Sequence, residues 1–163
     1  MDLPATGSPS ITVLGIGNVL LGDEGVGVHA MRAFAESSKD LSELHFLDGG
    51  TLSFLLAPEI ESRDGLIVLD AAELQASAGE IRVFEGAAMD AFLGSNRKRS
   101  VHEVGLIDLM AIAALSGRLP ERRALIAIQP ASIDWSERPT DSVAAAVPDA
   151  CTRARELVER WRQ

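Results

Sequence analysis

The sequence contains one cysteine, Cys151, among its 163 residues. A single thiol cannot form an internal disulfide, and it cannot build a metal site that needs several cysteines. The first ten residues, MDLPATGSPS, are polar and carry no recognisable secretory signal, so we expect residues 1–10 to be a flexible N-terminal tail. Together these features favour a cytoplasmic protein.

Positive charge and long apolar runs are also scarce. Lysine and arginine number 15 against 24 acidic residues, which gives a formal net charge of −9. Such a charge repels the phosphates of nucleic acids and anionic membrane surfaces, so neither is an expected partner. Because no apolar run approaches the roughly 20 residues of a membrane-spanning helix, no membrane insertion is expected.

What remains is the composition of an ordinary globular domain, with 47% apolar and 24% charged residues. The length fits one domain with a sizeable core. We find no internal repeat, low-complexity tract or linker, and therefore predict a single domain over residues 11–163.

Hydrophobic periodicity predicts strands that alternate with helices. The expected strands cover residues 11–16, 43–47, 65–70, 79–84 and 124–128. Residues 65–70 are nearly all apolar, as in a central parallel strand buried on both faces. Residues 79–84 alternate between apolar and polar, which indicates a strand near an edge and allows an antiparallel one. The alternation as a whole predicts a mainly parallel sheet covered on both sides.

Helices are expected between these strands. The first carries Val26, Ala30, Ala33 and Phe34 on one face. A brief helix over 51–57 is expected to stop at Pro58. Ser100 and Glu103 form a predicted capping box for a buried helix that ends near residue 115.

The final helix is predicted from a stripe of apolar residues with Pro148 in its early part, where it is expected to introduce a kink. The stripe comprises Val147, Cys151, Ala154, Val158 and Trp161.

Three candidate functional residues follow from this topology. Glu24 follows the first strand, Asp70 ends the third, and His102 opens the buried helix. If the first and third strands are neighbours, both carboxylates meet at the edge where open α/β sheets bind ligands. A histidine at a helix N-terminus tends to be neutral and able to bind a metal. Two carboxylates and an imidazole suit a divalent transition ion with open coordination positions.

The glycine-rich loop after the first strand allows a second interpretation. Gly15-Ile16-Gly17 begins like a dinucleotide-binding fingerprint, and Asp48 occupies the place of a ribose-binding acid. Leu20 replaces the third glycine, however, and the adjacent acids Asp23 and Glu24 would repel a pyrophosphate. Asp23 is instead expected to cap the first helix, which places Glu24 in its first turn.

Other polar residues receive simpler interpretations. His29 and His45 fall inside a predicted helix and strand and are expected to be structural. Cys151 lies on an apolar stripe and is expected to pack rather than to react. The basic run Arg97-Lys98-Arg99 is read as a solvated loop, with contact to an acidic partner as the alternative.

Five motifs, in this order, resemble those of the nickel-iron hydrogenase maturation endopeptidases. They are GIGNVLLGDEGVGV at 15–28, LDGGT at 47–51, LIVLDA at 66–71, SVHEVGL at 100–106 and IQPASIDW at 128–135. They span nearly the whole predicted domain. The resemblance implies a doubly wound three-layer α/β/α sandwich of the phosphorylase/hydrolase-like kind. Its five-stranded, twisted, mostly parallel sheet would contain one antiparallel strand.

The resemblance also implies a function. Enzymes of this family remove a C-terminal extension from the hydrogenase large-subunit precursor, as the last step of active-site maturation, and recognise nickel already inserted there. The catalytic and metal-binding residues fall on Glu24, Asp70 and His102. Substrate recognition falls on Asp48, Gly49 and Gly50. The nickel is carried by the substrate, zinc or cadmium could replace it, and a monomer is expected.

Three further hypotheses stay open on the sequence. The chain could be a non-catalytic nickel-sensing chaperone of the same precursor, a nucleotide-binding protein, or a germination-type protease of related architecture. The residue that activates water is also open, because a metal and a carboxylate are both able to do so.

Overall fold

The computed structural model describes residues 7–50, 54–95 and 101–163, with side chains from residue 105 onward in the last range. Its centre is a five-stranded sheet in the order β2-β1-β3-β5-β4. The strands are β1 (Ile11–Ile16), β2 (Leu44–Gly50), β3 (Gly65–Ala71), β4 (Ile81–Glu85) and β5 (Arg122–Ile128). β4 lies at one edge and pairs antiparallel with β5, while the other pairs are parallel. The expected sheet, with β1 and β3 as neighbours, is confirmed.

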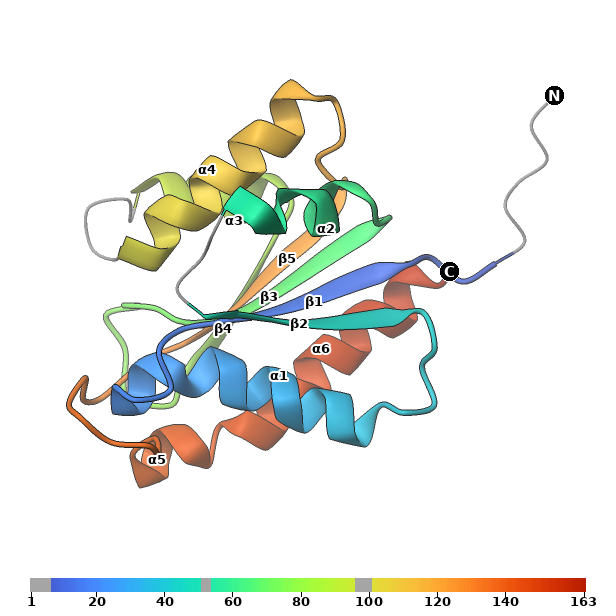
Figure 1. The fold of residues 1–163 in the computed structure, drawn as a ribbon. Helices are drawn as coiled ribbons and strands as arrows, with labels where there is room; N and C mark the ends of the chain where they lie inside the picture. Colours follow the sequence, from blue (N-terminus) through green and yellow to red (C-terminus); the bar gives the residue numbers. More distant parts are fainter. Residues whose placement is uncertain (1–6, 51–53, 96–100) are drawn as a thin grey trace, which may run out of the picture.

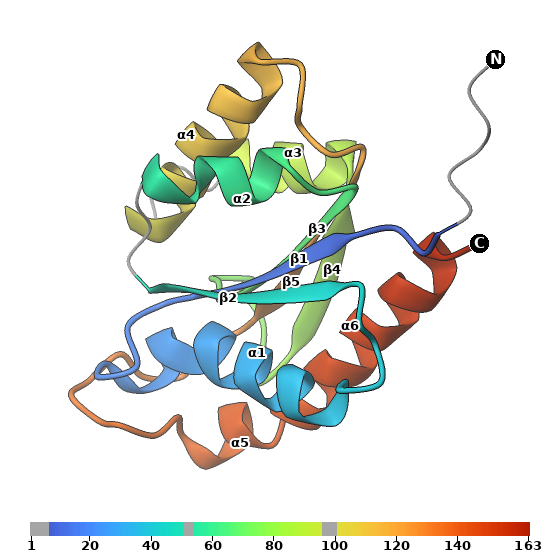
Figure 2. The ribbon, with the colours of Figure 1, turned by 45° about the vertical axis from the view of Figure 1, so that its right-hand side comes forward.

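Helices cover both faces of the sheet (Figure 1). On one face lie α1 (Val26–Ser37), the short α5 (Asp141–Ala144) and α6 (Val147–Trp161). On the other lie α2 (Ala57–Glu61), α3 (Ala87–Ser95) and α4 (Val101–Leu115), as the rotated view in Figure 2 also shows. The three-layer α/β/α sandwich is therefore confirmed.

Two apolar clusters, one on each face, form the core. Alternate residues of β1 enter different clusters: Ile11 and Val13 pack towards α1 and α6, whereas Leu14 and Ile16 pack towards α2 and α4. This division follows from the period-2 geometry of a strand. Each central strand is thus apolar on both faces, as the continuous apolar run in β3 predicted.

Two glycines let α1 approach the strands closely. A Cβ atom at Gly27 would lie 2.2 Å from the Leu69 carbonyl oxygen and 2.5 Å from that of Ile16. A Cβ atom at Gly15 would lie 2.7 Å from the Met31 Cβ. The N-terminus of α1 therefore packs directly on the carboxyl ends of β1 and β3, which fixes the turn that precedes it.

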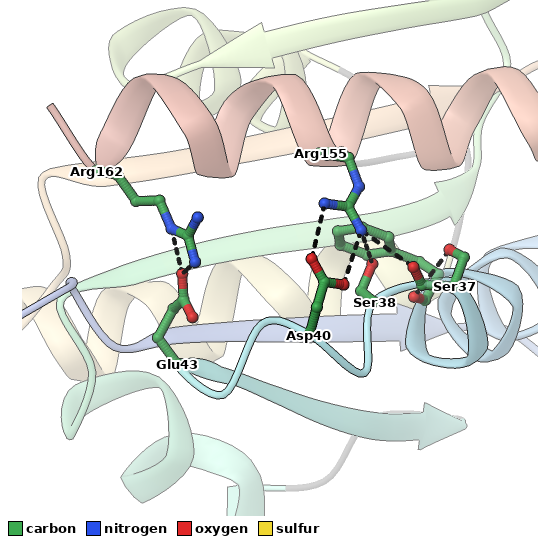
Figure 3. A network of polar contacts seen from close by, with 7 residues as sticks. Ser37, Ser38, Asp40, Glu43, Arg155 and Arg162 are labelled. Atoms are coloured by element: carbon green, nitrogen blue, oxygen red, sulfur yellow. Dashed lines mark hydrogen bonds and ion pairs between the residues drawn. The ribbon is translucent and has the colours of Figure 1, made fainter.

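Polar contacts join α6 to the connection between α1 and β2 (Figure 3). Arg155 donates to Asp40 Oδ1 at 3.1 Å and to the Ser37 carbonyl oxygen at 3.0 Å. Arg162, which follows the last residue of α6, forms an ion pair with Glu43. These contacts supplement the apolar stripe of α6, whose members pack in the α1-facing cluster as predicted.

The predicted helix stop at Pro58 is wrong, whereas Pro148 lies in the early part of the final helix as predicted. Pro58 does not stop a helix: it lies in the first turn of α2, which follows a 3₁₀ turn, η2 (Phe54–Leu56). Pro148 likewise lies in the first turn of α6. The amide hydrogens of a first turn have no intrahelical acceptor, so proline fits there without a kink.

Other differences concern element lengths. β2 extends to Gly50, so Asp48, Gly49 and Gly50 are its last residues instead of a following loop. α3 was not predicted. The capping-box residue Ser100 and the Arg97-Lys98-Arg99 run lie outside the described residues. Within the described ranges, no helix is both long and apolar enough to cross a membrane.

Candidate functional site

The predicted site residues come from elements that meet at one edge of the sheet. Figure 1 shows the carboxyl ends of β1 and β3 at the same side of the molecule as the N-termini of α1 and α4. Glu24 belongs to the 3₁₀ turn η1 (Gly22–Gly25), Asp70 to the end of β3, and His102 to the first turn of α4. The topology places all three backbones at this edge.

Asp70 is almost fully buried, with 3% of its surface exposed. It is the penultimate residue of β3 and lies opposite Ala127 of β5 in the parallel ladder. Burying a carboxylate costs free energy unless its charge is compensated. Its position at the carboxyl end of a central parallel strand, where open α/β sheets bind ligands, makes Asp70 a candidate functional residue.

Glu24 is half-buried in a turn of closely packed backbone. Gly17 has φ +130°, and a Cβ atom there would lie 1.9 Å from the Glu24 carbonyl oxygen. A Cβ atom at Gly25 would lie 2.6 Å from the Val19 Cα. We expected Glu24 in the first turn of the first helix, but it lies in η1, just before α1.

His102 is described only by its backbone, so its imidazole belongs to the prediction and not to the observed geometry. Among the residues whose side chains are described, no group of three or more His, Cys, Asp or Glu could hold a metal. The side chain of His102, the third predicted ligand, is not among these residues. The set of Glu24, Asp70 and His102 therefore stays a prediction; two carboxylates and one imidazole are donors that suit a borderline divalent ion.

Asp23 has a different role from the helix cap that we expected. Its fully buried carboxylate accepts hydrogen bonds from the backbone of a distant segment, residues 131–140. Oδ2 accepts from the amides of Ala131 at 2.8 Å and Ser132 at 3.0 Å. Oδ1 accepts from the Thr140 amide at 2.6 Å, and the Thr140 hydroxyl donates to both oxygens.

The electrostatics of Asp23 follow from these contacts. Burial alone would raise its pKa, but the hydrogen bonds from Ser132, Ala131 and Thr140 together lower it below the ordinary value. The carboxylate is therefore ionised and ties the segment after β5 to the turn that carries Glu24. Sequence reasoning missed this role, because the partners lie more than 100 positions away and share no periodic pattern with Asp23.

Asp48, Gly49 and Gly50 reach the same edge at the end of β2. Asp48 Oδ1 accepts from the Gly50 amide at 2.9 Å, and Oδ2 forms an ion pair with Arg32 of α1 at 3.1 Å. Gly50 has φ +46°, a conformation that glycine adopts without strain. The carboxylate thus shapes its own turn, and recognition of a substrate by these residues stays a prediction.

The remaining candidates lie where the sequence placed them. Cys151 is half-buried, its Sγ lies 3.7 Å from the Ala30 carbonyl oxygen, and burial raises the pKa of its thiol. Such a thiol is protonated and packs instead of reacting. His29 lies in α1 and His45 in β2. Burial, followed by the charge of Arg32, lowers the pKa of His29.

The sequence matches the family model of the hydrogenase maturation proteases, HycI, over residues 28–157. The chain belongs to this family. It is 36% identical over 155 residues to the hydrogenase expression/formation protein HupD of Rhizobium leguminosarum bv. viciae, covering 94% of this chain and 76% of that relative. It is 30% identical to the hydrogenase 2 maturation protease of Escherichia coli K12, covering 86% of this chain and 85% of the relative.

Solved structures of the family share the fold. The hydrogenase maturating endopeptidase HybD of E. coli superposes with a TM-score of 0.84 at 27% identity, over 93% of both chains. The [NiFe] hydrogenase maturation protease HybD of Thermococcus kodakarensis gives a TM-score of 0.75 at 28% identity, over 91% of this chain and 99% of the other. Membership in this family makes the protein a hydrolase, a protease of hydrogenase maturation.

Proposed function

We propose that this protease removes the C-terminal extension of a nickel-iron hydrogenase large-subunit precursor, in the last step of active-site maturation. It would recognise nickel already bound in the precursor. Glu24, Asp70 and His102 would complete the coordination of that ion, together with the precursor's own ligands. The observation that carries this proposal is the buried Asp70 carboxylate at the end of β3, on the edge that also bears Glu24.

The packing around the two carboxylates supports a preorganised site. The absence of a side chain at Gly27 lets the start of α1 pack closely on the Leu69 carbonyl group, one residue before Asp70. Gly17 and Gly25 likewise permit close packing of the backbone around Glu24. Fixed ligands lose little entropy when a substrate-borne ion arrives, which favours recognition of a loaded precursor.

The nickel would supply Lewis-acid chemistry at the scissile carbonyl when the precursor is bound. The chain's own residues would orient the ion and the peptide beside it. If Asp70 or Glu24 does not bind the ion, that carboxylate would accept a proton from the attacking water. Activation by the nickel ion and activation by a carboxylate would draw on the same three residues. Both would require the peptide to enter at this edge of the sheet.

The direct test is cleavage of a purified large-subunit precursor, with and without nickel, read by intact mass. We expect loss of one C-terminal peptide from the nickel-loaded precursor and none from the nickel-free one. Cleavage of both forms would leave a peptidase without nickel recognition. Binding of the precursor without any cleavage would favour the non-catalytic chaperone.

Two variants connect this test to the site. Asp70→Asn keeps the shape of the side chain and removes its charge, and His102→Ala removes the imidazole. Each is expected to fold, as judged by circular dichroism, and to leave the loaded precursor uncut. Normal cleavage by both variants would refute the assignment of these residues.

A further inference from the structure

Exposed apolar side chains lie on two loops beside the Glu24 turn. Leu20, in the loop that leads to η1, is 47% exposed. Ile133 and Trp135, in the segment after β5, are 57% and 81% exposed. The two loops lie side by side, since the Ser136 amide donates to the Leu20 carbonyl oxygen at 3.0 Å. The Gly22 amide donates back to the Ser136 carbonyl oxygen at 2.9 Å.

These loops are held in one conformation by contacts other than the exposed side chains. The buried Asp23 carboxylate binds the backbone on both sides of Trp135, at Ser132 and at Thr140. Gly22 has φ +60°, and a Cβ atom there would lie 3.2 Å from the Asp134 carbonyl oxygen. Trp135 is therefore presented on a fixed backbone without packing into the core itself.

An exposed tryptophan on a rigid loop is informative because tryptophan is usually well buried. The second tryptophan of the chain, Trp161, follows that rule with 8% exposure. At interfaces, tryptophan supplies a large apolar area at little entropic cost and is enriched among the residues that dominate binding. A preordered loop reduces the cost of binding further.

We propose that Trp135, with Leu20 beside it, is a specificity determinant of the protease. It would contact an apolar side chain of the large-subunit precursor next to the scissile bond. This inference rests on the proposed function. The precursor is the occupant of choice because Leu20 lies four residues before Glu24 on the same connection between β1 and α1, and the Glu24 amide donates to the Leu21 carbonyl oxygen at 3.3 Å. A peptide bound at Glu24 would therefore lie close to this surface. A second copy of the chain is disfavoured, because each copy carries a net charge of −9.

The test compares Trp135→Ala with a control variant, Leu115→Ala, in steady-state cleavage of a nickel-loaded precursor that the wild type cuts. Leu115 is 90% exposed at the C-terminal end of α4, the end opposite to the site. We expect Trp135→Ala to raise KM about tenfold or more with little change in kcat. Trp135→Phe is expected to recover most of the affinity, and Leu115→Ala to behave as wild type.

Fluorescence gives a readout that does not depend on cleavage. Binding of the precursor is expected to shift the emission of the wild type, and the shift is expected to be absent in Trp135→Phe, in which Trp161 remains. An unchanged KM in Trp135→Ala, while the wild type cleaves, would overturn the inference. A dimer of the wild type that Trp135→Ala dissociates, with KM unchanged, would also overturn it, because a second copy of the chain would then occupy this surface. If the wild type cleaves no precursor, the proposed function fails. In that case, tryptophan emission that stays unchanged when the precursor is added would separately overturn this inference.

Discussion

At the scale of single residues, Asp23 holds a distant backbone segment in place through its buried carboxylate. Asp23→Ala would leave the amides of Ala131, Ser132 and Thr140 without their acceptor. Losing a buried charged acceptor with several donors is expected to cost about 3 kcal/mol of unfolding free energy. Urea unfolding measures this loss. Glu137→Ala, an exposed acid in the same segment, is expected to stay within about 0.5 kcal/mol of wild type and serves as the control.

His29 is expected to make stability depend on pH. Its Nε2 is buried and has no hydrogen-bond partner among the described residues, and burial with the Arg32 charge lowers its pKa from 6.5. The unfolded state therefore binds more protons just below pH 6.5. Stability should be lost as the pH falls from about 6.5 towards the folded-state pKa, and the loss should be smaller in His29→Gln. Urea midpoints at pH 7.5 and 5.5 for both proteins test this, and equal losses would contradict it.

At the scale of elements, the contact between α1 and the ends of β1 and β3 decides where Glu24 lies. Gly27→Ala would place a Cβ atom 2.2 Å from the Leu69 carbonyl oxygen, so α1 must move away from the sheet. We expect a loss of about 3 kcal/mol or more from overpacking and a strong loss of cleavage. The control is Gly94→Ala in α3, where a Cβ atom meets nothing within 4 Å. That change should stabilise the protein by up to about 1 kcal/mol. Thermal unfolding and the cleavage assay compare the two.

The elements also show which patterns a sequence can convey. Every strand was predicted near its observed position, because apolar runs and alternation report burial directly. α3 was missed, since its sequence, AAMDAFLGS, is short and has no clear apolar stripe. The error at Pro58 came from treating proline as a helix terminator, although its position within a helix decides its effect.

The site was predictable to the extent that topology alone determines it. Glu24 and Asp70 follow from the rule that ligands bind at the carboxyl ends of neighbouring parallel strands. Asp23 was misassigned because its hydrogen-bond partners are set by tertiary structure and lie beyond the range of local capping patterns. Trp135 was visible only as part of a motif, and its exposure could not be read from the residues around it.

At the scale of the whole molecule, helices cover both faces of the sheet and the net charge of −9 makes copies repel one another. We expect one chain per particle alone and one chain per precursor in the complex. Light scattering coupled to size-exclusion chromatography, at physiological salt, measures both masses. A stable dimer of the free protein would contradict this expectation.

The bond between Asp23 and the segment around Ser132 and Thr140 also orders events in time. During synthesis, the turn that carries Glu24 leaves the ribosome more than 100 residues before the segment that supports it. The nascent chain therefore cannot form these hydrogen bonds until Thr140 has been synthesised. On the proposed function, the support of the Glu24 turn by residues 131–140 would therefore form late in synthesis, after the other parts of the turn.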